Sequence, residues 1–299
     1  EVLNIDINKP KKHSHVKFWI KGDIRKKDQL EDIFKKFKPN YLVNLAADLG
    51  MDHVDLSNLQ TNIIGVKNIV NISNQFKTLK KIIFTSSLLV CKNGYIPKNS
   101  TDYCPPNFYG ESKMIGEKII RDSKLKCEWI IIRPTSIWGP WFDYSYKQFF
   151  VVISENKYFH IGNKIIEKPA SYVGNTTHAI KELLLNSDEK INKKTFYIAD
   201  YPSYSTREWA NTIQRNLGTK KIYTAPIWAL FIISCFGSIY KVLTKVDPPL
   251  TLSRLKNIRT GGNYPIRNLE EVVGELPFNL NQGVEKTISW LRLKKIIKN

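Results

Sequence analysis

The feature that most constrains this sequence is an alternation of short apolar runs with longer segments of helical periodicity. The apolar runs are rich in the β-branched and aromatic residues that favour strands, and they cover residues 1–6, 16–23, 41–47, 80–87 and 127–135. Between them, apolar residues recur at helical spacing, as at Leu30, Ile33, Phe34 and Phe37. Strands that are apolar on both faces and alternate with helices predict an α/β protein with a doubly wound parallel sheet.

The same pattern predicts two parts of unequal size. Residues 1–144 carry the alternation and form the larger predicted domain, to which residues 171–201 return with a late strand at 194–200. The remainder of residues 145–299 is mostly helical and is predicted to be a smaller lobe that binds substrate. Chemistry in parallel sheets sits at the carboxyl ends of the strands, so the residues that follow the strands are the first candidates for a site.

Charge, cysteine and histidine content narrow the classes of function. The net charge is +19, but the lysines are scattered and form no basic stripe with interleaved aromatic residues, so nucleic acid is not an expected partner. Four cysteines lie far apart without a CxxC pair, which favours reduced thiols and a cytoplasmic location. His13 and His15 share a polar segment without acidic or cysteine partners, so no metal site is expected.

One apolar segment has two interpretations. The run APIWALFIISCFGSIY, residues 225–240, falls short of the roughly 20 apolar residues that span a bilayer. It can form a buried or partner-contacting helix. It can also form a helix that lies at a membrane surface, assisted by the lysines around it, and this would make the protein peripherally membrane-associated.

A tyrosine and a lysine four residues apart, Tyr109 and Lys113, share one face of a predicted helix. A phenol with a pKa near 10 is a poor base at neutral pH, but a nearby ammonium group favours the phenolate. Such a phenolate can take the proton of a substrate hydroxyl while a hydride leaves the same carbon. Many helices carry this spacing without any chemistry, so the pair gains meaning only from its surroundings.

Two further residues have the character that this chemistry needs. Ser87 follows the apolar strand of residues 80–87 and can donate a hydrogen bond to the reacting oxygen. Asp6 closes the first strand and can bind the ribose hydroxyls of a dinucleotide, although an Asp in this position is often only a cap.

Together these motifs resemble the extended short-chain dehydrogenase/reductase family, in its branch of NAD-dependent sugar-nucleotide epimerases and dehydratases. The resemblance covers nearly the whole chain. It rests on Asp6 and on the motifs GDIR (22–25), NLAA (44–47), TNIIGVKN (61–68), FTSSLLV (84–90), YGESK (109–113) and IIRPTSIWGP (131–140). It implies a Rossmann-type fold with a smaller helical C-terminal substrate lobe, and NAD as the cofactor.

The resemblance also implies residue roles. Tyr109 would be the catalytic acid and base, Lys113 its pKa tuner and a ribose contact, and Ser87 the third catalytic residue. The implied cofactor contacts are Asp6 on the adenosine ribose, Asp23 and Ile24 on adenine, Leu45, Ala46 and Ala47 beside the pyrophosphate and nicotinamide ribose, Asn62 as support of that loop, and Pro134 and Thr135 against the nicotinamide. The Tyr109 helix is, by analogy with this fold, a candidate for pairing across a homodimer.

Two departures from the family pattern matter. The glycine-rich phosphate loop should lie on a strand–turn–helix unit ahead of Asp6, and the printed sequence begins after it, so the first β-α unit appears to be missing and we expect a truncated chain. Leu88 and Leu89 stand where the family's dehydratases carry an Asp-Glu pair. Because leucine transfers no proton, epimerisation or simple oxidoreduction is favoured over dehydration.

The sequence therefore predicts an NAD-dependent epimerase or oxidoreductase that acts on a nucleotide sugar. Two alternatives stay open. The first is a steroid- or lipid-alcohol dehydrogenase of the same superfamily, which the apolar segment 225–240 would suit. The second is a non-catalytic binding protein with an incomplete cofactor site.

Overall fold

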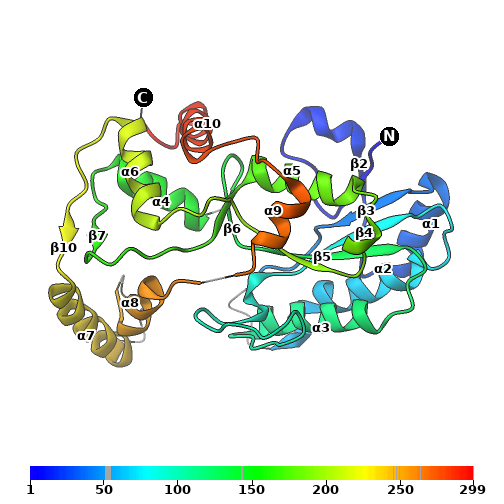
Figure 1. Ribbon diagram of the computed structural model, residues 1–299, viewed down its shortest axis with the longest axis horizontal. Helices are drawn as coiled ribbons and strands as arrows, with labels where there is room; N and C mark the ends of the chain where they lie inside the picture. The colour runs from blue at the N-terminus through cyan, green and yellow to red at the C-terminus, as the bar shows by residue number, and fades with distance from the viewer. Residues whose placement is uncertain are drawn as a thin grey trace. The chain divides into compact units, whose positions relative to one another are not determined.

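The computed structural model describes residues 1–50, 55–142, 144–244, 246, 248, 250–262 and 264–298 (Figure 1). The chain forms two compact units. The first comprises Glu1–Lys92, Pro97–Pro134 and Ile180–Tyr197, and the second comprises Asn93–Ile96, Thr135–Ala179 and Ile198–Asn299.

These boundaries differ from the predicted ones at residues 144 and 171–201. The first unit leaves off at Pro134, because the next strand, β6 (Ser136–Trp138), pairs in parallel with β8 (Ala170–Tyr172) inside the second unit. The segment that returns to the first unit is correspondingly shorter and spans Ile180–Tyr197. Sequence periodicity could not show this, because β6 has the same apolar character as the strand before it.

The first unit is a parallel α/β structure, as predicted. Its strands are β1 (Asn4–Asp6), β2 (Trp19–Lys21), β3 (Tyr41–Asn44), β4 (Lys81–Thr85), β5 (Glu128–Pro134) and β9 (Thr195–Ile198). Its helices and helical turns are η1 (His13–Phe18), α1 (Lys27–Phe37), η2 (Leu56–Leu59), η3 (Thr61–Gly65), α2 (Val66–Ser73), η4 (Leu88–Val90), α3 (Phe108–Asp122) and η5 (Glu189–Ile191). One sheet has the order β3-β4-β5-β9 and a second consists of β1 and β2, and the strand pairs of defined register are parallel.

The core of the first unit explains the apolar runs. Ile82 and Phe84 of β4 and Ile131 of β5 are almost fully buried, and they pack with Leu30 and Phe34, which come from the periodic face of α1. Because both faces of β4 are covered, its sequence is apolar at nearly every position. The sheet supports the helices and loops in which the candidate site residues lie.

Strands β1 and β3 border a common cavity. Among the described residues, β1 pairs only with β2 and β3 only with β4, so each strand has one free edge. A cavity of about 680 Å³ is lined by residues 3–8 around β1, by residues 41–49 around β3 and by apolar side chains of α1. Two free parallel edges on one cavity leave room for a further parallel strand between them. The missing β-α unit itself stays a prediction.

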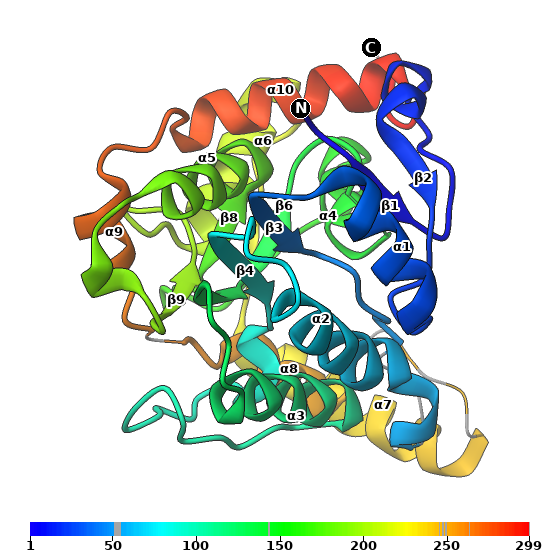
Figure 2. The same ribbon diagram turned by 90° about the vertical axis from the view of Figure 1, so that its right-hand side faces the viewer.

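The second unit is mostly helical. In addition to β6 and β8 it contains β7 (His160–Ile161), β10 (Thr224–Ala225), α4 (Tyr144–Ser154), α6 (Thr206–Leu217), α7 (Ile227–Thr244), α8 (Leu252–Arg259), α9 (Arg267–Val273) and α10 (Leu280–Leu293), while α5 (Val173–Leu185) crosses the boundary between the units. Its core is aromatic: the Trp138 ring lies 5.0 Å from Trp209 and 5.2 Å from Tyr172. Helices α7 and α8 lie side by side (Figure 1, Figure 2).

A buried carboxylate ties the second unit together. Asp200 accepts hydrogen bonds from the Asn175 amide at 2.9 Å, from the Tyr172 backbone N–H at 2.9 Å and from the Tyr204 hydroxyl at 3.0 Å. The Asn175 amide also donates to the Phe278 carbonyl, at 2.9 Å. Asn175 is therefore a structural connection within this unit.

The cavity between β1 and β3 generates a prediction about stability. Fusing a strand–glycine-rich turn–helix unit ahead of Glu1 should fill the cavity and pair both free edges. We expect the free energy of unfolding to rise by about 3 kcal/mol or more, because several apolar side chains become buried. Urea unfolding of the fused and printed chains measures this. A fusion with two prolines in the added strand is the control, and equal stability of all three proteins would contradict the prediction.

Candidate active site

Three predicted catalytic side chains meet at the carboxyl end of β4. The Lys113 ammonium donates a hydrogen bond to the carbonyl of Thr85, the last residue of that strand, at 3.0 Å. Lys113 Nζ also lies 6.0 Å from the centre of the Tyr109 ring. The Ser87 side chain lies close enough to Tyr109 to lower the pKa of its phenol against the larger effect of burial. All three residues are buried, so the structure gathers them into one sheltered cluster.

Local sequence fixes the start of the helix that carries Tyr109 and Lys113. The Asn107 side chain caps α3 by accepting the Gly110 backbone N–H at 2.9 Å. At Gly110 the helix touches the chain that follows β4, and an added Cβ would lie 2.1 Å from the Leu89 carbonyl oxygen. Only glycine permits this approach. Ser87 holds the other side of the contact, because its hydroxyl caps the turn η4 by accepting the Leu89 N–H at 3.1 Å.

Burial governs the protonation of the site. Burial raises the pKa of Tyr109, and the Ser87 side chain only partly offsets this. Burial also lowers the pKa of Lys113 to about 8, against an opposing influence of the Glu117 carboxylate. The sequence argument expected the ammonium to lower the phenol pKa. In the structure the effect of burial is larger, so the phenol is held in its acid form at neutral pH.

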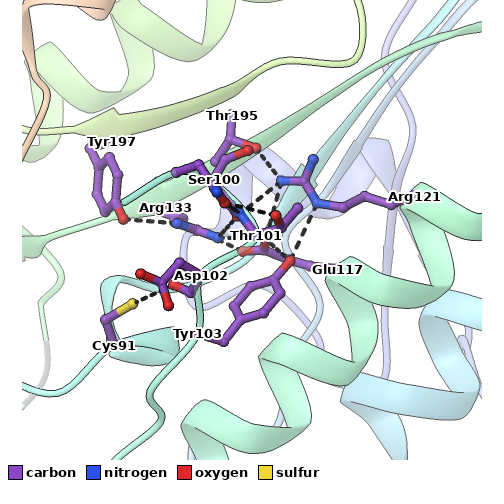
Figure 3. Close-up of polar contacts among 11 residues, drawn as sticks. Cys91, Ser100, Thr101, Asp102, Tyr103, Glu117, Arg121, Arg133, Thr195 and Tyr197 are labelled. Carbon is purple, nitrogen blue, oxygen red and sulfur yellow. Dashed lines mark hydrogen bonds and ion pairs between the residues drawn. The ribbon is translucent and has the colours of Figure 1, made fainter. Parts of the chain in front are cut away.

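A buried ion pair lies one helical turn beyond Lys113 (Figure 3). Arg133 of β5 binds Glu117 of α3 with both ends of its guanidinium, Nε to Oε1 at 2.8 Å and Nη2 to Oε2 at 2.7 Å. Both side chains are fully removed from solvent. This two-point contact joins the helix of the site to the central sheet.

Surrounding polar groups satisfy the remaining hydrogen-bonding capacity of Arg133 and Glu117. Arg133 donates to the Tyr197 hydroxyl at 2.8 Å and to the Ser100 carbonyl at 2.7 Å, and the Tyr103 hydroxyl donates to Glu117 at 3.0 Å (Figure 3). Burial alone would lower the pKa of Arg133, but its bonds to Glu117 and Tyr197 outweigh this and raise that pKa above its ordinary value, so the guanidinium stays charged. Arg133 therefore has a structural role, although it opens a motif that the resemblance places beside the cofactor.

Six of the predicted cofactor contacts line the cavity between β1 and β3. They are Asp6, Asp23, Ile24, Leu45, Ala46 and Ala47. Asp6 is exposed at the end of β1, and its carboxylate accepts the Asn8 backbone N–H at 2.7 Å, as in an ordinary capping turn. Asp23 is paired with Arg25 at 2.7 Å, and this bond lowers the pKa of the Asp23 carboxyl. The Asp23 carboxylate is thus ionised, and the oxygens of both side chains are acceptors for ribose or adenine hydrogen bonds.

Asn62 connects the loop that follows β3 to helix α3. Its side chain exchanges two hydrogen bonds with the backbone of Asp48, at 2.9 Å and 3.0 Å, and donates to the Ser112 hydroxyl at 2.9 Å. Asn62 lies in η3, a π-helical segment, and such segments are frequent at functional sites. Support of the loop, which the resemblance implied for Asn62, is consistent with these bonds and remains a proposed role.

The last two predicted contacts fall on either side of the boundary between the units. Pro134 ends β5 in the first unit, whereas Thr135 belongs to the second unit and donates its hydroxyl to the Ile198 carbonyl at 2.8 Å. Their role against a nicotinamide stays a prediction.

Two buried hydroxyls beside the cluster lack partners. Thr85 Oγ1 and Ser86 Oγ are both inaccessible, and neither has a hydrogen-bond partner within the described part of the chain. Unsatisfied buried hydroxyls cost free energy, so the end of β4, next to Ser87, is a locally unfavourable part of the fold.

Sequence reasoning missed Glu117 and the capping Asn107. A signal for Glu117 existed, because it continues the spacing of Tyr109 and Lys113 by another four residues along the same helix face. Its partner Arg133 is distant in sequence, so only the fold reveals the pair. Asn107 was overlooked because the prolines before it already suggested a helix start.

Comparison with known proteins places this arrangement in context. The sequence model of the 3-beta hydroxysteroid dehydrogenase/isomerase family matches residues 2–227. The chain is 25% identical over 295 residues to the N-acetyl-alpha-D-glucosaminyl-diphospho-ditrans,octacis-undecaprenol 4-epimerase of Escherichia coli O157:H7, covering 95% of this chain and 87% of that protein. It is 24% identical over 293 residues to the decarboxylating sterol-4-alpha-carboxylate 3-dehydrogenase of Saccharomyces cerevisiae, covering 91% and 82%.

The fold is also shared with solved structures. The crystal structure of the Bordetella bronchiseptica enzyme WbmG in complex with NAD and UDP superposes with a TM-score of 0.68 at 17% sequence identity, covering 93% of this chain and 81% of that one. At this level of identity the likeness concerns the fold.

The buried lysine predicts an unusual pH dependence of stability. Because the pKa of Lys113 falls from 10.5 to about 8 on folding, the charged form costs the folded state roughly 3 kcal/mol below pH 8. The unfolded chain binds the extra proton between pH 8 and 10.5, so this cost disappears as pH rises through that window. We expect Lys113→Met to raise the free energy of unfolding relative to the parent, and the gain should be largest at pH 7, up to about 3 kcal/mol.

Urea unfolding at pH 7 and near pH 10 measures this difference. Lys118→Met, at an exposed position of the same helix, is the matched control and should show no such trend. A stability difference between Lys113→Met and the parent that does not change with pH would contradict the prediction.

The ion pair predicts non-additive stability. Glu117→Leu alone should destabilise the protein by about 3–5 kcal/mol, because it leaves the Arg133 charge buried without a partner. Adding Arg133→Met should recover a large part of that loss, since no isolated charge remains. A double-mutant cycle in urea measures the coupling, and simple additivity would contradict the role of the pair.

Proposed function

Because the chain belongs to the 3-beta hydroxysteroid dehydrogenase/isomerase family, we propose that it is an NAD-dependent enzyme that oxidises a secondary alcohol of a sugar at the Ser87–Tyr109–Lys113 cluster. The observation that carries this proposal is the meeting of these three buried side chains at the carboxyl end of β4. In an open parallel sheet that is the edge at which ligands bind.

The described residues suit parts of a dinucleotide. Asp6 and Asp23 offer acceptor oxygens around the cavity between β1 and β3, with Ile24 as an apolar surface. The buried hydroxyls of Thr85 and Ser86, near Lys113, lack hydrogen-bond partners among the described residues. The printed sequence holds no GxxGxxG turn for the pyrophosphate. When bound, NAD accepts the hydride that the alcohol carbon releases.

Side chains of this chain transfer the proton of the substrate hydroxyl. Ser87 orients the substrate oxygen through its hydroxyl and also contacts Tyr109. Tyr109 exchanges the hydroxyl proton with that oxygen. Lys113 stabilises the phenolate electrostatically when Tyr109 has given up its proton. Because burial keeps Tyr109 protonated at neutral pH, the phenol must first release its proton to solvent before it can accept the proton of the alcohol. In the reductive half of an epimerisation Tyr109 returns that proton to the substrate oxygen.

Epimerisation or simple oxidoreduction is the reaction class we favour. Leu88 and Leu89 follow Ser87 and form the turn η4 with Val90, so no acid or base stands where a dehydratase would need one. In an epimerase the ketone is reduced on its other face and the cofactor is recycled.

The substrate we propose is a sugar carried on a diphosphate, with a nucleotide as the leading carrier. Among the similar proteins, one structure holds UDP and one relative is named for a sugar diphosphate. The net charge of +19 suits an anionic substrate. In keeping with the sequence analysis, a homodimer through α3 stays part of this proposal.

A second candidate is the oxidation of a lipid-like alcohol. It is favoured by the exposed apolar face of α7 and by relatives named for a sterol and for an undecaprenol-linked sugar. Activity on a hydrophobic alcohol, without activity on nucleotide sugars, would favour the lipid-alcohol function over the nucleotide-sugar function.

A substitution at Tyr109 tests the mechanism. In a chain that binds NAD, Tyr109→Phe should reduce turnover of a nucleotide sugar by about a hundredfold or more, because the proton-transfer group is removed. NAD affinity, followed by fluorescence titration, should change little. Tyr223→Phe, at a largely exposed tyrosine, is the control.

Unchanged turnover in Tyr109→Phe would refute the mechanism. Failure of the parent chain to bind NAD, even with an added strand–glycine-rich turn–helix unit, would instead favour the non-catalytic alternative.

A further inference from the structure

Helix α7 exposes large apolar side chains to solvent, whereas an ordinary surface helix exposes polar ones. Its large apolar side chains at intervals of three or four residues point outward along one stripe. We call this the α7 stripe, and it consists of Trp228, Ile232, Phe236, Ile239 and Leu243. Phe236 is 70% exposed and Leu243 is 78% exposed. Phe231 and Tyr240, also half exposed, widen the stripe on either side.

The opposite face of α7 is small and tightly packed. Ser234 is fully buried, and an added Cβ at Gly237 would lie 2.0 Å from the Leu250 carbonyl oxygen. The Ser238 hydroxyl accepts the Leu252 backbone N–H at 3.0 Å, at the start of α8. These close contacts fix which face points inward. The helix therefore cannot rotate to bury its stripe without losing them.

Positive charge accompanies the stripe. From residue 219 to residue 262 the sequence holds seven Lys and Arg residues and a single Asp. Lys220 and Lys221 are exposed ahead of α7, and Lys256 and Arg259 are exposed on α8, which lies beside α7 (Figure 1, Figure 2). An apolar stripe bordered by cations is complementary to an anionic lipid surface, where apolar side chains enter the acyl boundary and cations contact the headgroups.

We propose that the α7 stripe docks the protein onto an anionic bilayer surface, with α7 lying in the plane of the interface. The stripe extends over roughly 22 Å of helix, which suits a helix that lies flat. Trp228 and Tyr240 have the amphipathic rings that are favoured at the headgroup level. None of the described helices is long and apolar enough to cross a membrane.

A second copy of the chain fits the stripe less well than a bilayer does. Two copies placed stripe to stripe would bring their basic segments together, and each copy already carries a net charge of +19. Like charges at an interface oppose association, whereas an anionic surface attracts the same groups. The match to the family model covers residues 2–227, and α7 begins at Ile227.

Vesicle flotation of the whole chain tests the proposal. The protein is mixed with vesicles that contain one third phosphatidylglycerol in phosphatidylcholine, or phosphatidylcholine alone, without substrate or cofactor. We expect flotation with the anionic vesicles and at least about tenfold weaker binding to the neutral ones. Raising NaCl from about 0.1 M to about 0.5 M should weaken binding several-fold.

Paired variants make the test specific. Phe236→Glu/Leu243→Glu should lose binding at least about tenfold. Ile96→Glu/Ile165→Glu adds the same charge at two positions that are 73% and 68% exposed, and it should bind nearly as well as the parent. The uncharged Phe236→Gln/Leu243→Gln variant separates loss of apolar contact from added charge. Circular dichroism verifies that each variant is folded, which is expected because the replaced side chains are exposed.

Three outcomes would overturn the proposal. The first is no flotation of the parent with anionic vesicles. The second is equal flotation of the parent and both stripe variants. The third is a parent dimer, seen by sedimentation, that the stripe variants break while vesicles bind none of them, which would assign the stripe to a second copy. Since no cofactor or substrate is present, the result is independent of the role proposed for Tyr109.

Discussion

Two bonds between Glu117 and Arg133 hold helix α3, which carries the proposed catalytic residues Tyr109 and Lys113. These bonds hold α3 against β5 at a point one turn beyond Lys113, where neither side chain has access to water. A buried ion pair is expensive to form, yet it is very specific in geometry, because only one arrangement satisfies both groups. The positions of Tyr109 and Lys113 relative to Ser87 follow from that arrangement.

The site accepts an energetic cost that a purely structural core would avoid. Lys113 is buried next to a phenol and a carbonyl instead of an acid, and Thr85 and Ser86 keep hydroxyls without partners in the described chain. Costs of this kind gather where a protein must interact with something outside its own fold. The stable sheet behind β4 makes them tolerable.

The sequence was informative where pattern alone decides structure. Continuous apolar runs predicted the parallel sheet, and the spacing of Leu30, Ile33 and Phe34 predicted the buried face of α1. It could not reveal Arg133 as the partner of Glu117, since the two are joined only by the fold. It also could not decide the environment of Tyr109, because the pKa of a phenol depends on burial as well as on neighbouring charge. For the segment 225–240, composition left two interpretations. The exposure of its large side chains argues against a fully buried helix, and the choice between a partner and a membrane surface stays a proposal.

The contact at Gly110 has a consequence for natural variation. The backbone of α3 there approaches Leu89 more closely than any side chain would permit. A single inherited change from glycine to alanine would push the helix away from the chain that carries Ser87, while every reactive group remained present. Such an allele would read as conservative in a gene survey and yet behave as a loss of function.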